Sequence, residues 1–158
     1  MKVFSIRSAM LTLLIALLLP AALVQAAPVT PTGAKTTPPP ADFSVLTVFD
    51  PDFTYLERGQ GYISDAGKGK VNIWGETFGT VRTDEIGVQL TLQRWTGTAW
   101  IDVYYGGSET ENNAAYAYSS INVSVESGYY YRTKAYHWIE EGSVIESGYR
   151  FSSSYLAS

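Results

Sequence analysis

Residues 86–93 read Ile-Gly-Val-Gln-Leu-Thr-Leu-Gln, with a large apolar side chain at every second position. Successive side chains of a β-strand point to opposite sides of the backbone, so this period of two is typical of a strand with one buried face. The pattern therefore places Ile86 and Leu90 in a core and points Gln89 and Gln93 toward solvent.

The same period recurs along the chain on both sides of this stretch. Further alternating runs occupy residues 71–78, 101–105, 121–125, 129–138 and 144–152. No segment beyond residue 26 carries an apolar stripe at helical spacing. Residues that favour turns separate the runs, at 65–69, 96–98, 106–113, 127–128 and 140–142.

Six or seven short strands at this spacing predict an all-β fold. We expect an antiparallel β-sandwich of immunoglobulin or fibronectin type III character, with a small β-barrel as the main competing architecture. The last two runs would form strands F and G, and either Tyr129 or Tyr131 stands where such folds carry a tyrosine corner.

The chain divides into three parts by composition. Residues 1–26 have a charged start, an apolar stretch and small residues before Ala26, which predicts a cleaved secretory signal peptide. Residues 27–43 hold five of the seven prolines and predict a disordered Pro/Thr-rich spacer. Residues 44–158 form the predicted β-sandwich domain. We therefore expect a secreted, extracellular protein.

Composition excludes several classes of function. The chain has no cysteine, which rules out disulfides and a thiolate nucleophile, and a single histidine, which rules out a histidine-rich metal cage. Loss of Lys2 and Arg7 with the signal would leave 9 basic and 15 acidic residues, a net charge of −6. Such acidity argues against nucleic acid and, after signal cleavage, against a membrane partner.

No catalytic or metal-binding motif is apparent. His137 is the only imidazole, and its place in an alternating run favours a packed or rim histidine over a catalytic base. The acidic side chains lie mostly in turns, where solvated charges are expected. Asp50 and Asp52 could offer oxygen ligands to calcium but lack the spacing of an EF-hand. The sequence therefore predicts no catalytic residue, no resident metal and no cofactor.

Aromatic residues are the feature that most exceeds the needs of a core. Thirteen lie between Trp100 and Tyr155, more than a domain of this size can enclose along with its aliphatic side chains. Alternation points the aromatic and polar residues of two neighbouring strands, C and F, toward the same outer face. The predicted ligand-binding set is Trp95, Tyr130, Arg132, Tyr136, Trp138, Gln89 and Gln93. Lys134 shares this face, and Trp100 and Tyr104 on the adjacent strand could extend it.

Three segments together resemble a known family. They are residues 62–75 (YISDAGKGKVNIWG), 92–103 (LQRWTGTAWIDV) and 128–137 (GYYYRTKAYH). In this order they are similar to an uncharacterised family, a domain of unknown function, of small secreted proteins from Gram-positive bacteria. The resemblance spans about residues 61–147 and implies export and a compact β domain, without assigning any functional residue.

These observations favour a secreted, non-catalytic binding module whose aromatic sheet face contacts a glycan or a protein. An exported hydrolase that acts on polysaccharide or cell wall through a carboxylate pair is the alternative from another class. A self-associating surface or matrix protein is the third possibility. The sequence leaves the ligand and the oligomeric state open.

Overall fold

The computed structural model describes residues 30–40 and 49–158, and these form an all-β protein without helices. The strands are β1 (Leu56–Gly67), β2 (Lys70–Trp95), β3 (Trp100–Ser124), β4 (Tyr130–Glu141), β5 (Val144–Phe151) and β6 (Tyr155–Leu156). All of the pairings are antiparallel. The predicted signal peptide and the predicted start of the domain at residue 44 lie outside the described residues.

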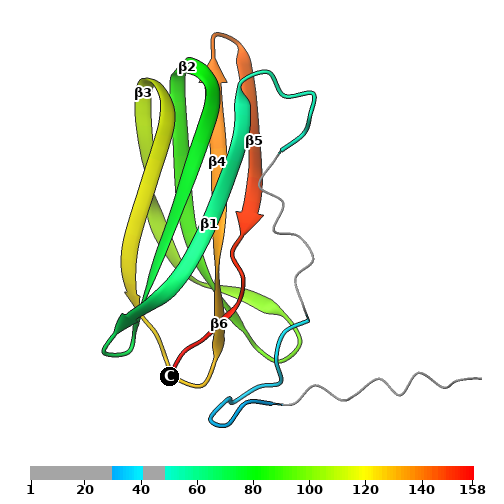
Figure 1. Cartoon of the computed structure of the whole chain (residues 1–158), viewed down its shortest axis with the longest axis vertical. Helices are drawn as coiled ribbons and strands as arrows, with labels where there is room; N and C mark the ends of the chain where they lie inside the picture. The colour runs from blue at the N-terminus through cyan, green and yellow to red at the C-terminus, as the bar shows by residue number, and fades with distance from the viewer. Residues whose placement is uncertain (1–29, 41–48) are drawn as a thin grey trace, which may run out of the picture.

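The long strands β2 and β3 form one hairpin that runs the length of the molecule (Figure 1). Its ladder is interrupted between Phe78 and Thr83, where the register shifts and the hairpin bends. The bend divides the curled sheet into two half-sheets. The first half-sheet contains β1, residues 70–79 of β2 and residues 116–124 of β3. The second contains residues 100–112 of β3, residues 85–95 of β2, β4 and β5.

The two half-sheets enclose the core between their inner faces. Val71 and Ile73 from the first half-sheet and Ile86, Val88 and Leu90 from the second are fully buried. Gly75 lies so close to the opposite half-sheet that an added Cβ would stand 2.9 Å from Leu90. β1 likewise crosses β4 (Figure 1), where Gly61 approaches Ala135. The alternation of residues 86–93 therefore predicted the buried face of this strand correctly.

The expectation of short, separate strands was wrong in one respect. Residues 106–113, expected to form a polar loop, belong to β3, and residues 108–112 pair with residues 85–89 of β2. The strands bend instead of breaking, because Gly106–Gly107 coincides with a register shift that absorbs the curvature. The turns at 96–98 and 127–128 were predicted correctly. Those predicted at 65–69 and 140–142 exist but are shorter, because β1 extends to Gly67 and β4 extends to Glu141. Gly67, Gly69, Gly97, Gly128 and Gly142 all have positive φ.

One tyrosine joins the start of β4 to the loop before it. The buried Tyr131 hydroxyl donates to the carbonyl oxygen of Glu126 and accepts the N–H of the same residue, both at 3.1 Å. Of the two tyrosines that the sequence singled out, Tyr131 is therefore the one whose hydroxyl binds the backbone upstream of β4.

The described part of the expected spacer packs against the base of the domain, below the strands (Figure 1). The N–H of Lys35 donates to the carbonyl oxygen of Gly128 at 2.7 Å, and the Lys35 ammonium pairs with Glu126. Residues 30–40 therefore differ from the free spacer that proline content suggested. Across both described ranges, no helix has the length and apolarity needed to cross a bilayer.

Candidate functional site

The outer face of the second half-sheet contains the residues that alternation brought together. Gln89 stands opposite Tyr136, Gln93 opposite Arg132, and Gly87 opposite Trp138 on β2 and β4. These pairs share the face that points away from the core. The adjacent strand β5 adds Tyr149 beside Tyr136. For these residues, the sequence therefore correctly predicted which residues are neighbours and which face of the sheet they occupy.

Exposure was predicted wrongly for three members of the set. Trp95, Tyr130 and Gln93 are each only 7% exposed. The indole N–H of Trp95 donates to the carbonyl oxygen of Thr37 at 3.0 Å, and its ring packs against Trp100 at 5.4 Å. Tyr130 pairs with Leu156 of β6. Residues 30–40 and the C-terminal strand thus remove the lower end of the face from solvent.

The buried side chain of Gln93 joins two charged groups across the sheet. Its side-chain N–H donates to Asp102 at 2.6 Å, and its oxygen accepts from Arg132 at 2.8 Å. Burial by itself would raise the pKa of Asp102, but the hydrogen bond from Gln93 and the positive charge of Lys134 outweigh it and hold that pKa below its usual value. Arg132 lies between the rings of Trp100 and Phe151, 4.4 Å and 4.2 Å from their centres. At this end of the face, the polar and charged side chains are therefore bound to one another.

The upper part of the face contains an accessible aromatic surface, which we call the Trp138 platform: Tyr136, Trp138 and Tyr149. The Trp138 ring covers Gly87 so closely that a Cβ added there would stand 2.0 Å from the ring. The indole N–H donates to Glu85 at 2.8 Å, which fixes the ring on the strand. Tyr136 stacks beside Trp138 with ring centres 5.7 Å apart.

A shallow pocket of about 270 Å³ opens beside this platform. Its lining combines two aromatic rings with polar and aliphatic groups from four neighbouring strands, β2 to β5: Gln89, Ser108, Tyr136, Trp138, Glu140 and Ile145. Ile145 and Tyr149 are 68% and 51% exposed. Gln89, Tyr136 and Trp138 were predicted from the sequence, whereas Ser108, Glu140 and Ile145 were not. Gly87 was the sequence signal that could have indicated this site, because a glycine inside a strand often marks a place where another group approaches the backbone closely.

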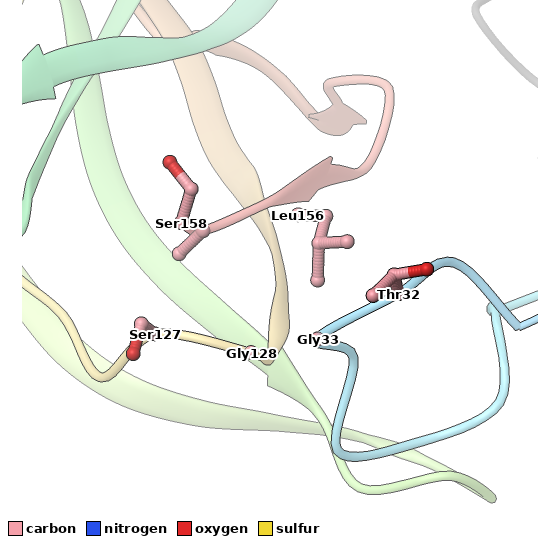
Figure 2. A pocket seen from close by; sticks show the side chains of 7 residues that line it. Thr32, Gly33, Ser127, Gly128, Leu156 and Ser158 are labelled. Carbon is pink, nitrogen blue, oxygen red and sulfur yellow. The ribbon is translucent and has the colours of Figure 1, made fainter.

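A second hollow of about 300 Å³ lies where residues 30–40 meet the C-terminal strand. Figure 2 shows Thr32 and Gly33 facing Leu156 across it, with Ser127 and Gly128 on a third side. The lining consists of small and aliphatic side chains and main chain, without an acid, a base or an aromatic ring. It offers little chemistry for recognising a ligand.

His137 is packed in the core. It is completely buried, and its Nδ1 lies 2.7 Å from the hydroxyl of Thr77. That hydroxyl donates to the carbonyl oxygen of Gly87, so it accepts the proton of Nδ1. Burial, aided by the charge of Arg150, lowers the pKa of His137 to about 3. The ring is neutral at physiological pH and has no path to solvent, as a packed histidine should be.

Asp50 and Glu146 are among the acidic groups that have structural partners. Asp50 accepts the N–H of Asp52 at 3.0 Å, which closes a local turn. Glu146, expected to be a solvated turn charge, is only 6% exposed and accepts three backbone N–H groups. Within the described ranges, no group of three or more His, Cys, Asp or Glu side chains is arranged to hold a metal ion.

Comparisons with known proteins add little to this geometry. No family model and no curated protein matches the chain. A crystal structure of a protein from Archaeoglobus fulgidus is similar over 65% of this chain and 98% of its own, with 15% identity and a TM-score of 0.34. A likeness that low carries no argument about fold or function.

Proposed function

We propose that this protein is an extracellular, non-catalytic module that binds a carbohydrate on the Trp138 platform. The observation that carries the proposal is the placement of Trp138 over Gly87 with its N–H held by Glu85. A ring laid along the strand and fixed at one edge presents its other face outward without losing much conformational freedom on binding.

The chemistry of the pocket suits a sugar ring. The face of an aromatic ring carries partial negative charge, which attracts the weakly positive C–H groups on one side of a pyranose. Gln89, Ser108 and Glu140 surround the platform with donors and acceptors for hydroxyl groups. Pockets for small ligands usually combine an apolar floor with a few such polar groups.

The negative charge of the protein and of its pocket narrows the class of sugar that we expect it to bind. The protein carries a formal net charge of −4, and Glu140 lines the pocket while Glu85 anchors the platform. Negative groups at the site disfavour uronic acids and phosphorylated glycans. A neutral polysaccharide, or one with amino groups, is therefore the favoured ligand class.

The order of the strands supports a fibronectin type III-like architecture for the module. In that scheme the first half-sheet supplies strands A, B and E, and the second supplies C′, C, F and G. β2 would provide both B and C, and β3 both C′ and E. The Tyr131 tyrosine corner at the start of strand F fits the same scheme. Export and the resemblance to the uncharacterised secreted family remain part of the proposal.

The test compares two tryptophans that are alike except for their position. Trp138 and Trp74 are both half-buried and both stack on a tyrosine, but Trp74 lies on the outer face of the other half-sheet. We expect Trp138→Ala to weaken binding to insoluble neutral polysaccharide at least about tenfold, and Trp74→Ala to leave it unchanged. Equal retention by both variants would refute the proposed site.

A second variant tests the platform without removing the ring. Gly87→Ala places a methyl group where the Trp138 ring now lies, so the ring must lift from the strand. Tryptophan fluorescence titrated with soluble oligosaccharide should then show weaker binding, although the indole is still present. A Gly107→Ala variant is the matched control, since a Cβ there meets nothing within 4 Å.

One observation favours a hydrolase as the second candidate. Glu85 and Glu140 face each other in the ladder between β2 and β4, beside the platform. Directly opposed residues have Cβ atoms about 4.5–5.5 Å apart, and retaining glycosidases hold their carboxyl groups about 5–5.5 Å apart. If purified protein releases soluble sugar from polysaccharide and Glu140→Gln stops the release while binding persists, this candidate replaces the binding module.

A further inference from the structure

In the first half-sheet, β3 has a free edge that could pair with another β-strand. Among the described residues β3 pairs only with β2, so residues 116–124 have one edge without a neighbouring strand. These nine residues, Tyr-Ala-Tyr-Ser-Ser-Ile-Asn-Val-Ser, contain no charge, proline or glycine. Their pairing with residues 70–78 is regular throughout.

The other strand edges carry features that discourage pairing. β1 contains Glu57, Arg58 and Asp65 and has register shifts near both ends. The 100–112 part of β3 contains Asp102, Glu109 and Glu111 and further shifts. β5 is held near the chain entering β1 by the Glu146 carboxylate. Natural sheets use such charges and bulges to block association, and residues 116–124 have neither.

We propose that a second copy of this chain pairs with this edge, antiparallel across a two-fold axis through Ser120. Antiparallel pairing of a strand with itself joins the two first half-sheets into one continuous sheet. A two-fold axis makes the interface isologous, so every contact occurs twice. The backbone N–H and C=O groups that now face water would supply the hydrogen bonds.

Side-chain sizes along the segment match this axis. Pairing about Ser120 places Tyr116 opposite Ser124 and Tyr118 opposite Asn122 on the outer face. On the inner face it places large residues opposite small ones in the same way, with Ala117 against Val123 and Ser119 against Ile121. Tyr116 and Tyr118 are 43% and 46% exposed and would each cover a small polar neighbour of the second copy.

Charge also favours a second copy at this place. An acidic chain repels its own copies where carboxylates approach one another, so an uncharged surface is a favourable place for two copies to meet. Residues 116–124 bring no like charges face to face in the paired arrangement. The interface is separate from the Trp138 platform, which lies on the outer face of the other half-sheet. Dimerisation therefore does not depend on the carbohydrate proposal.

Sedimentation equilibrium of the purified protein tests the inference. We expect a reversible dimer with a dissociation constant below about 1 mM. Ser120→Lys places two ammonium groups opposite each other on the axis and should raise that constant at least about tenfold. Thr110→Lys adds the same charge to an exposed position of the same strand and should have no effect. Circular dichroism of both variants checks that the fold is retained.

A cysteine variant reports the register directly. The chain has no cysteine, so Ser120→Cys introduces a single thiol on the proposed axis. Paired antiparallel residues have Cα atoms about 4.5–5.5 Å apart, within the range that a disulfide spans. Ser120→Cys should form a covalent dimer under mild oxidation and Thr110→Cys should not. A monomer at all concentrations up to about 1 mM, a dimer indifferent to Ser120→Lys, or equal cross-linking of both thiols would overturn the proposal.

Discussion

The carboxylate of Glu146 offers the sharpest test of how this fold is held together. One oxygen accepts the N–H of Thr54 at 2.6 Å, and the other accepts those of Tyr55 and Leu56 at 2.8 Å and 2.6 Å. The side chain belongs to β5, and its three donors lie where the chain enters β1. Glu146 therefore joins the start of one half-sheet to the edge of the other.

The cost of Glu146→Gln follows from these contacts. The amide oxygen can keep at most the two N–H groups on one side, and the amide nitrogen then faces the Thr54 N–H, which loses its acceptor. A buried donor left without a partner costs about 1–3 kcal/mol, and the Thr54 N–H, at an exposed residue, belongs at the lower end of that range. The remaining bonds also lose the extra strength that the charge of the carboxylate gives them. We expect the free energy of unfolding to fall by about 2–4 kcal/mol at pH 7.

The same variant has a defined pH dependence. Burial would raise the pKa of Glu146, but the three backbone N–H groups outweigh it and hold the pKa below its usual value of 4.5. Because the folded-state pKa is the lower one, the stabilisation is complete above about pH 5 and is lost as pH falls below 4.5. The difference between wild type and Glu146→Gln should therefore shrink in acid.

Urea denaturation followed by tryptophan fluorescence measures both quantities. Glu109→Gln, at an exposed position of β3, serves as the control and should change stability by less than about 0.5 kcal/mol. A loss of that small size for Glu146→Gln at pH 7, or an equal loss at pH 7 and pH 3, would show that the carboxylate does not act as described.

Two further predictions concern other buried groups. The ring protons of His137 should not titrate by NMR between pH 5 and 8, since its pKa is about 3, and its contribution to stability should be complete above pH 6.5 and decline as pH falls toward 3. A chain lacking residues 1–40 should leave the indole of Trp95 without its Thr37 acceptor, so its emission should shift to longer wavelength. If truncation of a Trp95→Phe chain produced the same shift, the shift would come from another tryptophan and the prediction would be wrong.

Sequence alternation predicted which side of a strand each residue occupies, and it did so best where strands are regular. It placed Val88 and Leu90 in the core, grouped Gln89 with Tyr136 and Trp138, and favoured a packed His137. It did not predict which other segments of the chain cover each side of a strand. Trp95 points as expected, yet residues 30–40 shield it, because coverage depends on a segment about sixty residues away in the chain.

The amino-acid sequence by itself determined the strand period, most of the turns and the residues that share a face, since these depend on neighbours one to ten positions apart. Only the tertiary structure decided that β2 and β3 bend through both half-sheets, that Glu146 is buried, and that residues 116–124 form an unprotected edge. These properties arise from contacts between segments distant in sequence, which no local pattern encodes.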